Sequence, residues 1–144
     1  MLKISNLQQV CDALEELGYD VKLRENAVYV AVGGTEKPFV AVLTINDQGE
    51  LVINCQVAKL GDIREEDIPT VQFCLLDANT RIRPFAFGIL TASDDPEYDV
   101  AENYPIVLTD SLPLGDLSTA ELAAAMDSLL VAVQSSGEAL RLGL

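Results

Sequence analysis

The sequence contains no histidine and no tryptophan among its 144 residues. Without an imidazole it cannot build a Ser-His-Asp triad, a Cys-His pair or a zinc site with histidine ligands. The most common machinery of acid–base catalysis is therefore excluded. We predict a protein that is not an enzyme and that uses no cofactor.

Positive charge is also scarce. Nine basic residues face 23 acidic ones, for a formal net charge of −14. The imbalance lies in the second half, because residues 84–140 include ten acidic residues and no lysine or arginine. Nucleic acids and anionic membranes repel such a chain, so we expect neither as a partner. A partner of this half is expected to present basic and apolar surface together.

Long apolar runs are missing as well. No segment reaches 18 uninterrupted apolar residues, and the N-terminus becomes polar too soon for a secretory signal. We therefore expect a cytoplasmic protein without membrane insertion. Cys11, Cys55 and Cys74 form no CxxC pair and stand within apolar patterns. They are predicted to be reduced thiols buried in the core.

The residues that are present favour one α+β domain spanning 1–144. Leucines and valines at helical spacing predict a helix over about 6–17, with a capping box at residues 5–8 and a stop at Gly18. Apolar and polar residues then alternate as in strands. The predicted strands cover 21–23, 27–32, 39–45 and 51–57, and the last two flank a hairpin turn at 46–49.

The second half adds a helix, two strands and a long helix. Acidic residues at 62–67 suit the start of a helix that closes near Asn79. The run 84–92 is apolar at nearly every position, which predicts a strand buried on both faces and paired with 104–110. A capping box at 118–121 opens a helix to about Arg141. The predicted fold is an antiparallel sheet flanked by helices, in the order αβββαββα, with three or four strands in the first group.

The segment 93–103 is a polar loop with five acidic residues. Asp95, Glu97 and Asp99 alternate like the first ligands of a calcium loop. Val100 and Ile106, however, occupy the positions of the required glycine and glutamate. A solvated loop is the favoured interpretation. The alternative function is calcium or magnesium binding, or a carboxylate-dependent enzyme that uses residues 94–102.

Arg81 and Arg83 flank Ile82, and in an extended segment they would project to the same side. They are interpreted as partners of Asp77 or of the acidic loop, with a contact to an anion or to another protein as the alternative. The apolar run and the alanine-rich helix carry more apolar surface than one small core covers, which predicts a homodimer. The candidate partner-binding residues are Arg81, Arg83, Phe85, Phe87, Met126 and Leu130. No catalytic or metal-ligating residue is predicted.

Four segments carry a family resemblance: residues 38–42, 51–57, 83–89 and 110–122. They resemble the YjfI-like bacterial proteins, and the order of elements resembles the type III secretion chaperone-like fold of YbjN-like proteins. The resemblance implies an acidic cytoplasmic homodimer with a chaperone-like or regulatory role that binds another protein. It also implies a partner from the stress response, such as a membrane-stress protein of the phage-shock type.

Overall fold

The computed structural model describes residues 3–33, 38–91 and 100–141. The helices are α1 (Leu7–Glu16), α2 (Ile68–Ala78) and α3 (Thr119–Arg141). The strands are β1 (Val21–Arg24), β2 (Ala27–Val32), β3 (Phe39–Ile45), β4 (Glu50–Lys59), β5 (Ala86–Ile89) and β6 (Pro105–Pro113). Four strands, rather than three, precede α2. All pairs are antiparallel, in the order β1-β2-β3-β4-β6-β5, so the predicted α+β class is confirmed.

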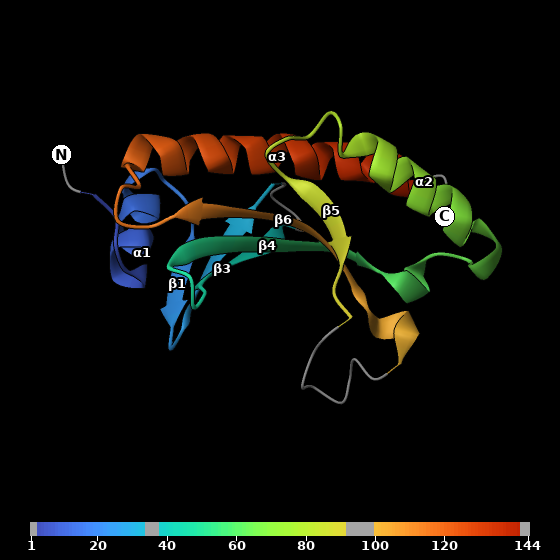
Figure 1. Ribbon diagram of the computed structural model, residues 1–144, viewed down its shortest axis with the longest axis horizontal. Coiled ribbons are helices and arrows are strands. Elements are labelled where there is room, and N and C mark those ends of the chain that lie inside the picture. The colour runs from blue at the N-terminus through green and yellow to red at the C-terminus, as the bar shows by residue number, and fades with distance from the viewer. Residues whose placement is uncertain (1–2, 34–37, 92–99, 142–144) are drawn as a thin grey trace.

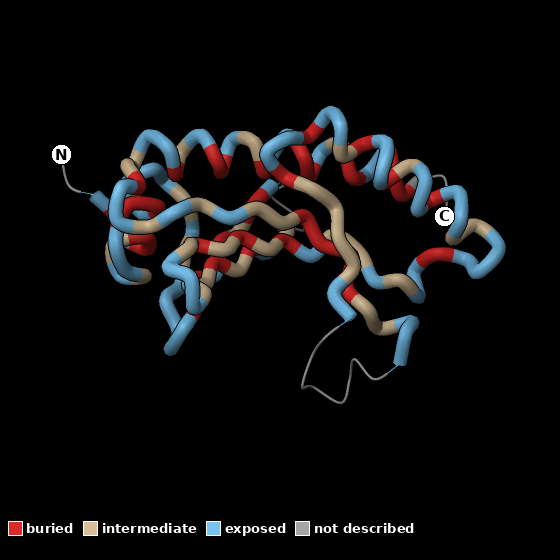
Figure 2. The backbone as a smooth tube through the Cα atoms, viewed as in Figure 1, coloured by how far each residue is buried: buried red, intermediate tan, exposed pale blue. Residues whose placement is uncertain are grey.

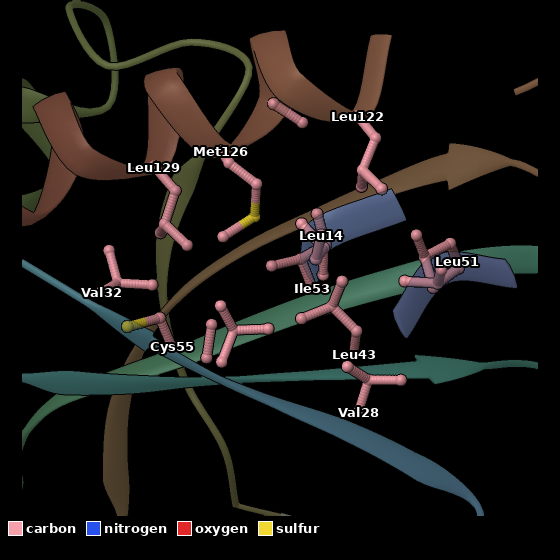
Figure 3. Close-up of a cluster of buried hydrophobic side chains, with 14 of the residues drawn as sticks. Leu14, Val28, Val32, Leu43, Leu51, Ile53, Cys55, Leu122, Met126 and Leu129 are labelled. Carbon is pink, nitrogen blue, oxygen red and sulfur yellow. The ribbon is translucent and has the colours of Figure 1, made fainter. Parts of the chain in front are cut away.

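The helices pack on one side of the sheet. In Figure 1, α3 runs along the sheet and α2 lies beside the C-terminal part of α3. The core beneath α3 contains Leu14 of α1, Leu43 of β3 and Ile53 of β4 together with Leu122 and Met126 of α3 (Figure 3). Because one cluster joins α1, α3 and the central strands, these helices cover the same face. No helix of the described chain covers the other face.

Burial alternates along the central strands, as the period of two predicts. In β2, Val28, Val30 and Val32 are buried, whereas Tyr29 between them is exposed. The same alternation appears in β3 and in the first part of β4 (Figure 2). Each strand therefore sends one set of side chains into the core and the other set to the uncovered face.

The start of α1 differs from its prediction by one residue. Asn6 is the N-cap, and its Oδ1 accepts a hydrogen bond from the backbone N–H of Gln9 at 2.9 Å. The Gln9 side chain in turn accepts from the N–H of Ser5 at 2.7 Å. Asparagine caps a helix as well as serine does, so the sequence is compatible with an N-cap at either Ser5 or Asn6. The predicted stop is confirmed, because Gly18 adopts a φ of +94° directly after the C-cap residue Leu17.

The long helix α3 begins as predicted. The N–H of Glu121 donates to Ser118 Oγ at 3.1 Å, and this hydroxyl donates to the Glu121 carboxylate at the same distance. Its 23 residues correspond to about 34 Å at 1.5 Å per residue. Among the described residues, no helix combines the length and apolar character needed to cross a membrane.

The apolar run 84–92 is not a central strand, so that prediction was wrong. Of its described residues, only Ala86–Ile89 form a strand, and this strand, β5, lies at the edge of the sheet beside β6. Phe85 precedes it and joins the main core, whereas Phe87 and Ile89 also pack on a second cluster beneath α2. The run is apolar because it serves two clusters. Its predicted pairing with β6 is confirmed by the register Phe87↔Leu108.

Met126 and Leu130, one helical turn apart on α3, provide a matched test of this packing. Met126 is 0% exposed in the main core, whereas Leu130 is 37% exposed. Met126→Ala is expected to lower the free energy of unfolding by about 2–5 kcal/mol, because a cavity forms beneath α3. Leu130→Ala should cost less than about 1 kcal/mol. Urea denaturation measures both values, and equal losses would contradict the placement of α3.

Asp110 of β6 lies on the covered side of the sheet, opposite Ile53. Its Oδ2 is buried and accepts no hydrogen bond in the described structure. Burial raises the pKa of this carboxyl, and a hydrogen bond from the Ser111 backbone offsets part of the rise. Folding therefore disfavours the ionised form, and stability is lost as pH rises from the ordinary pKa through the raised one.

Asp110→Asn removes this ionisation. The variant is expected to melt at a higher temperature than the wild type at pH 7, and the gain should shrink as the pH falls below the raised pKa, where the wild-type carboxyl is neutral. Calorimetric melting curves across the acidic pH range measure the difference. Asp47→Asn in the exposed hairpin turn controls for net charge. A gain that grows toward low pH would show that the carboxylate stabilises the fold.

Candidate functional site

Arg81 and Arg83 lie in the turn between α2 and β5, not in an extended segment. Arg81 Nη1 forms an ion pair with Asp77 Oδ2 at 2.9 Å, as the favoured interpretation predicted. Arg83 is exposed and makes no ion pair with any residue of the described chain. An exposed ion pair such as Arg81–Asp77 contributes little to stability.

Two of the candidate partner-binding residues are core residues. Phe85 is 1% exposed, and Met126 belongs to the same buried cluster beneath α3. Neither offers surface to a partner in this fold, because regular helical spacing and an apolar run do not separate inner from outer positions. Phe87 is half-buried, and Leu130 lies on the outer part of α3.

The most exposed large apolar side chains of the described chain lie on α2. Phe73 is 71% exposed and Leu76 is 69% exposed. A spacing of three residues places both on neighbouring positions of the helix surface. Val71 and Leu75 already fill the buried side of α2. The signal in the sequence was a short helix with more apolar residues than one face can bury.

A groove of about 340 Å³ lies next to Leu76, between α2 and the outer edge of β5. The N–H of Phe87 points to this edge and donates to Asn79 Oδ1 at 2.7 Å. The N–H of Leu90 instead donates to Pro105 O of β6 at 3.0 Å. Along an antiparallel strand, the backbone N–H and C=O groups of successive residues point alternately toward and away from the neighbouring strand. The N–H and C=O of Ile89 therefore point away from β6 and can pair with another strand.

Phe73, Leu76 and the outer edge of β5 are called the α2–β5 surface below. It is the strongest candidate for a site of protein contact, because exposed apolar side chains stand beside unpaired main-chain groups. Of the predicted residues, Phe87 lines its groove. Phe73 and Leu76 were missed by the sequence reasoning.

Residues 94–99 of the acidic loop lie outside the described chain. The following residues 101–103 form the short turn η4 (Ala101–Asn103), which packs against η1 (Leu60–Asp62). Among the described residues, no group of three or more acidic or cysteine side chains could hold a metal ion. Metal binding by the loop stays the alternative to the predicted solvated loop.

The prediction of buried thiols holds for two cysteines. Cys11 and Cys55 are buried, whereas Cys74 of α2 is half-buried beside the groove between α2 and α3. Burial raises the pKa of Cys55 to about 11. Burial, followed by the carboxylate of Glu15, also raises the pKa of Cys11. Neither buried thiol is activated for nucleophilic chemistry.

Comparison with known proteins shows the fold. No family model matches the chain, and no curated protein matches its sequence. The solved structure of YbjN from E. coli, a proposed transcription regulator, matches with a TM-score of 0.57 and 15% sequence identity. The match covers 97% of this chain and 89% of YbjN. The chain therefore has a YbjN-like fold.

The burial of the thiols predicts their order of reaction. Cys74 is expected to react with a disulfide reagent such as DTNB well before Cys11 and Cys55, because Cys74 is half-buried whereas the other two residues are buried. Absorbance then shows one fast thiol per chain in buffer and three in denaturant. In Cys74→Ser the fast phase should disappear. A fast phase that persists would mean that a core thiol is accessible.

Proposed function

We propose that this chain is a non-enzymatic protein-binding module that acts as an acidic cytoplasmic homodimer in a bacterium, in a regulatory or chaperone-like role. The observation that carries the proposal is the exposure of Phe73 and Leu76 beside a free strand edge. Fully burying one such side chain contributes roughly 1.5–3 kcal/mol. A contact that covers both, on two chains, therefore supplies substantial apolar stabilisation.

A second copy of the chain suits the α2–β5 surface because, in a twofold-symmetric dimer, the same surface of both chains lies in the interface. Antiparallel pairing of β5 with its symmetry mate satisfies the free main-chain groups of Ile89 and continues the sheet across the dimer. The same axis brings Phe73 and Leu76 of both chains together. The interface then combines apolar burial with hydrogen-bond pairing.

The charge of the chain favours regulation through another protein rather than through direct contact with DNA. YbjN is described as a proposed transcription regulator. In this chain, the net charge of −14 opposes approach to a nucleic acid. Arg64 and Arg81, two of the few basic side chains, are already paired with Asp67 and Asp77. A partner with basic and apolar surface, such as a stress-response or membrane-stress protein, fits this charge better.

The dimer predicts a specific effect of charge on α2. Phe73→Asp and Leu76→Asp are each expected to convert the protein to a monomer, because a buried carboxylate at the interface is strongly unfavourable. Light scattering on a size-exclusion column measures the mass. Leu17→Asp is the control, since Leu17 is also apolar and exposed, at 39%, but caps α1 at the other end of the molecule (Figure 1).

The control variant should remain a dimer. A wild type that stays monomeric at micromolar and higher concentrations would contradict the proposed dimer. Equal dissociation by Leu17→Asp and Phe73→Asp would place the contact elsewhere. Circular dichroism of each variant shows whether the fold is retained, so that loss of the dimer is not confused with unfolding.

A further inference from the structure

The uncovered face of the sheet holds a second hollow, separate from the α2–β5 surface. Its volume is about 710 Å³, within the range of roughly 300–1,000 Å³ that is typical of small-molecule sites. We call it the sheet pocket. Its lining residues are Pro38, Phe39, Val40, Val42, Asn54, Gln56, Val57, Ala58, Lys59, Asp62, Leu90, Pro105 and Val107. It thus joins β3, β4, β6 and the turn η1.

The walls of the sheet pocket are apolar although this face carries no helix. Val107 is only 3% exposed, whereas Val40 remains 48% exposed. An antiparallel sheet usually presents polar side chains on its uncovered face. A register shift in β4 between Gln56 and Ala58 distorts the strand within the pocket. Such irregularities are common beside functional sites, where they redirect a side chain.

Two carboxamides form the polar part of the sheet pocket. Asn54 and Gln56 occupy alternate positions of β4, so both project to the uncovered face. Neither side chain makes a hydrogen bond to another residue in the described structure. Each carboxamide offers one acceptor and two donors, which complement a peptide group or an ammonium and carboxylate pair.

Lys59 and Asp62 add one charge of each sign to the same lining. The carboxylate Oδ2 of Asp62 accepts a hydrogen bond from the backbone N–H of Lys59 at 2.9 Å. The ammonium of Lys59, however, forms no ion pair with Asp62 or with any other described residue. Two opposite charges therefore line the pocket without neutralising each other through a direct contact.

We propose that the sheet pocket binds a small zwitterion with an apolar side chain, either a free apolar amino acid or a short apolar peptide. Lys59 receives the carboxylate, Asp62 receives the ammonium, and the side chain packs on Val40 and Val42. Asn54 lies within reach of the peptide group of a longer ligand. Zero net charge matters, because a simple anion would approach a protein of net charge −14 against repulsion.

The test is an NMR titration of the full chain with L-leucine, L-phenylalanine and leucyl-leucine as separate probes. Binding is expected to shift the amide signals of residues that line the sheet pocket. A tighter response to leucyl-leucine identifies a peptide as the preferred source, and a tighter response to the single residues identifies a free amino acid. No shift at the pocket with any probe at millimolar concentrations would overturn the proposal.

Two ligand analogues and two variants test which charged residue of the pocket binds which charged group of the ligand. Leucinamide lacks the carboxylate and N-acetyl-leucine lacks the ammonium, so both should bind about tenfold more weakly than leucine, a loss of one charge-assisted hydrogen bond. Lys59→Gln is expected to lower the affinity for leucine about tenfold and to leave the affinity for leucinamide unchanged. Asp62→Asn is expected to lower the affinity for leucine and to leave the affinity for N-acetyl-leucine unchanged.

Lys22→Gln is the matched control, since Lys22 lies on the uncovered face in β1 but outside the sheet pocket. It should leave every affinity unchanged, and a loss equal to that of Lys59→Gln would show that only the overall charge matters. Retained amide spectra show that each variant is folded. The dimer rests on Phe73 and Leu76, so the failure of either proposal leaves the other standing.

Discussion

The structure depends on the packing of α3 across one face of the sheet. Met126 and Leu129 of this helix meet Leu43 and Ile53 of the central strands in one buried cluster. The side chains come from segments that are far apart in the sequence, so this contact holds the meander of β1–β4 against the C-terminal helix (Figure 3). Because the helices share that side, no helix of the described chain covers the opposite face of the sheet.

The same constraint explains why α2 exposes apolar residues. The helix covers the end of α3 and the edge strand β5 with Val71 and Leu75, in a second and smaller cluster. A short helix at the rim of the molecule can bury only one side against these elements. Phe73 and Leu76 then face solvent unless another chain covers them. A one-sided sheet thus produces both the α2–β5 surface and the sheet pocket.

Local patterns predicted the elements better than their places in the sheet. Alternation of apolar residues located the strands, and the stop at Gly18 and the capping box at Ser118 located a helix end and a helix start, because these signals act over a few residues. The prediction for the run 84–92 was wrong, because a continuous apolar segment is equally compatible with a central strand and with an edge strand whose side chains pack into two clusters. Met126 and Leu130 share one helical period, which cannot show which of them faces the sheet. The sheet pocket joins residues from β3 to β6, so no local pattern could reveal it.

One face of the sheet is covered by helices, and the other is open. Relaxation of methyl signals by a soluble paramagnetic agent in methyl-labelled protein distinguishes the two faces. Val40 and Val42 of β3 are expected to relax strongly, whereas their neighbour Leu43 and the facing Ile53 stay protected. Alternating relaxation along β3 would confirm that one face of the sheet is open. Equal protection of Val42 and Leu43 would contradict it, because both faces of the sheet would then be covered.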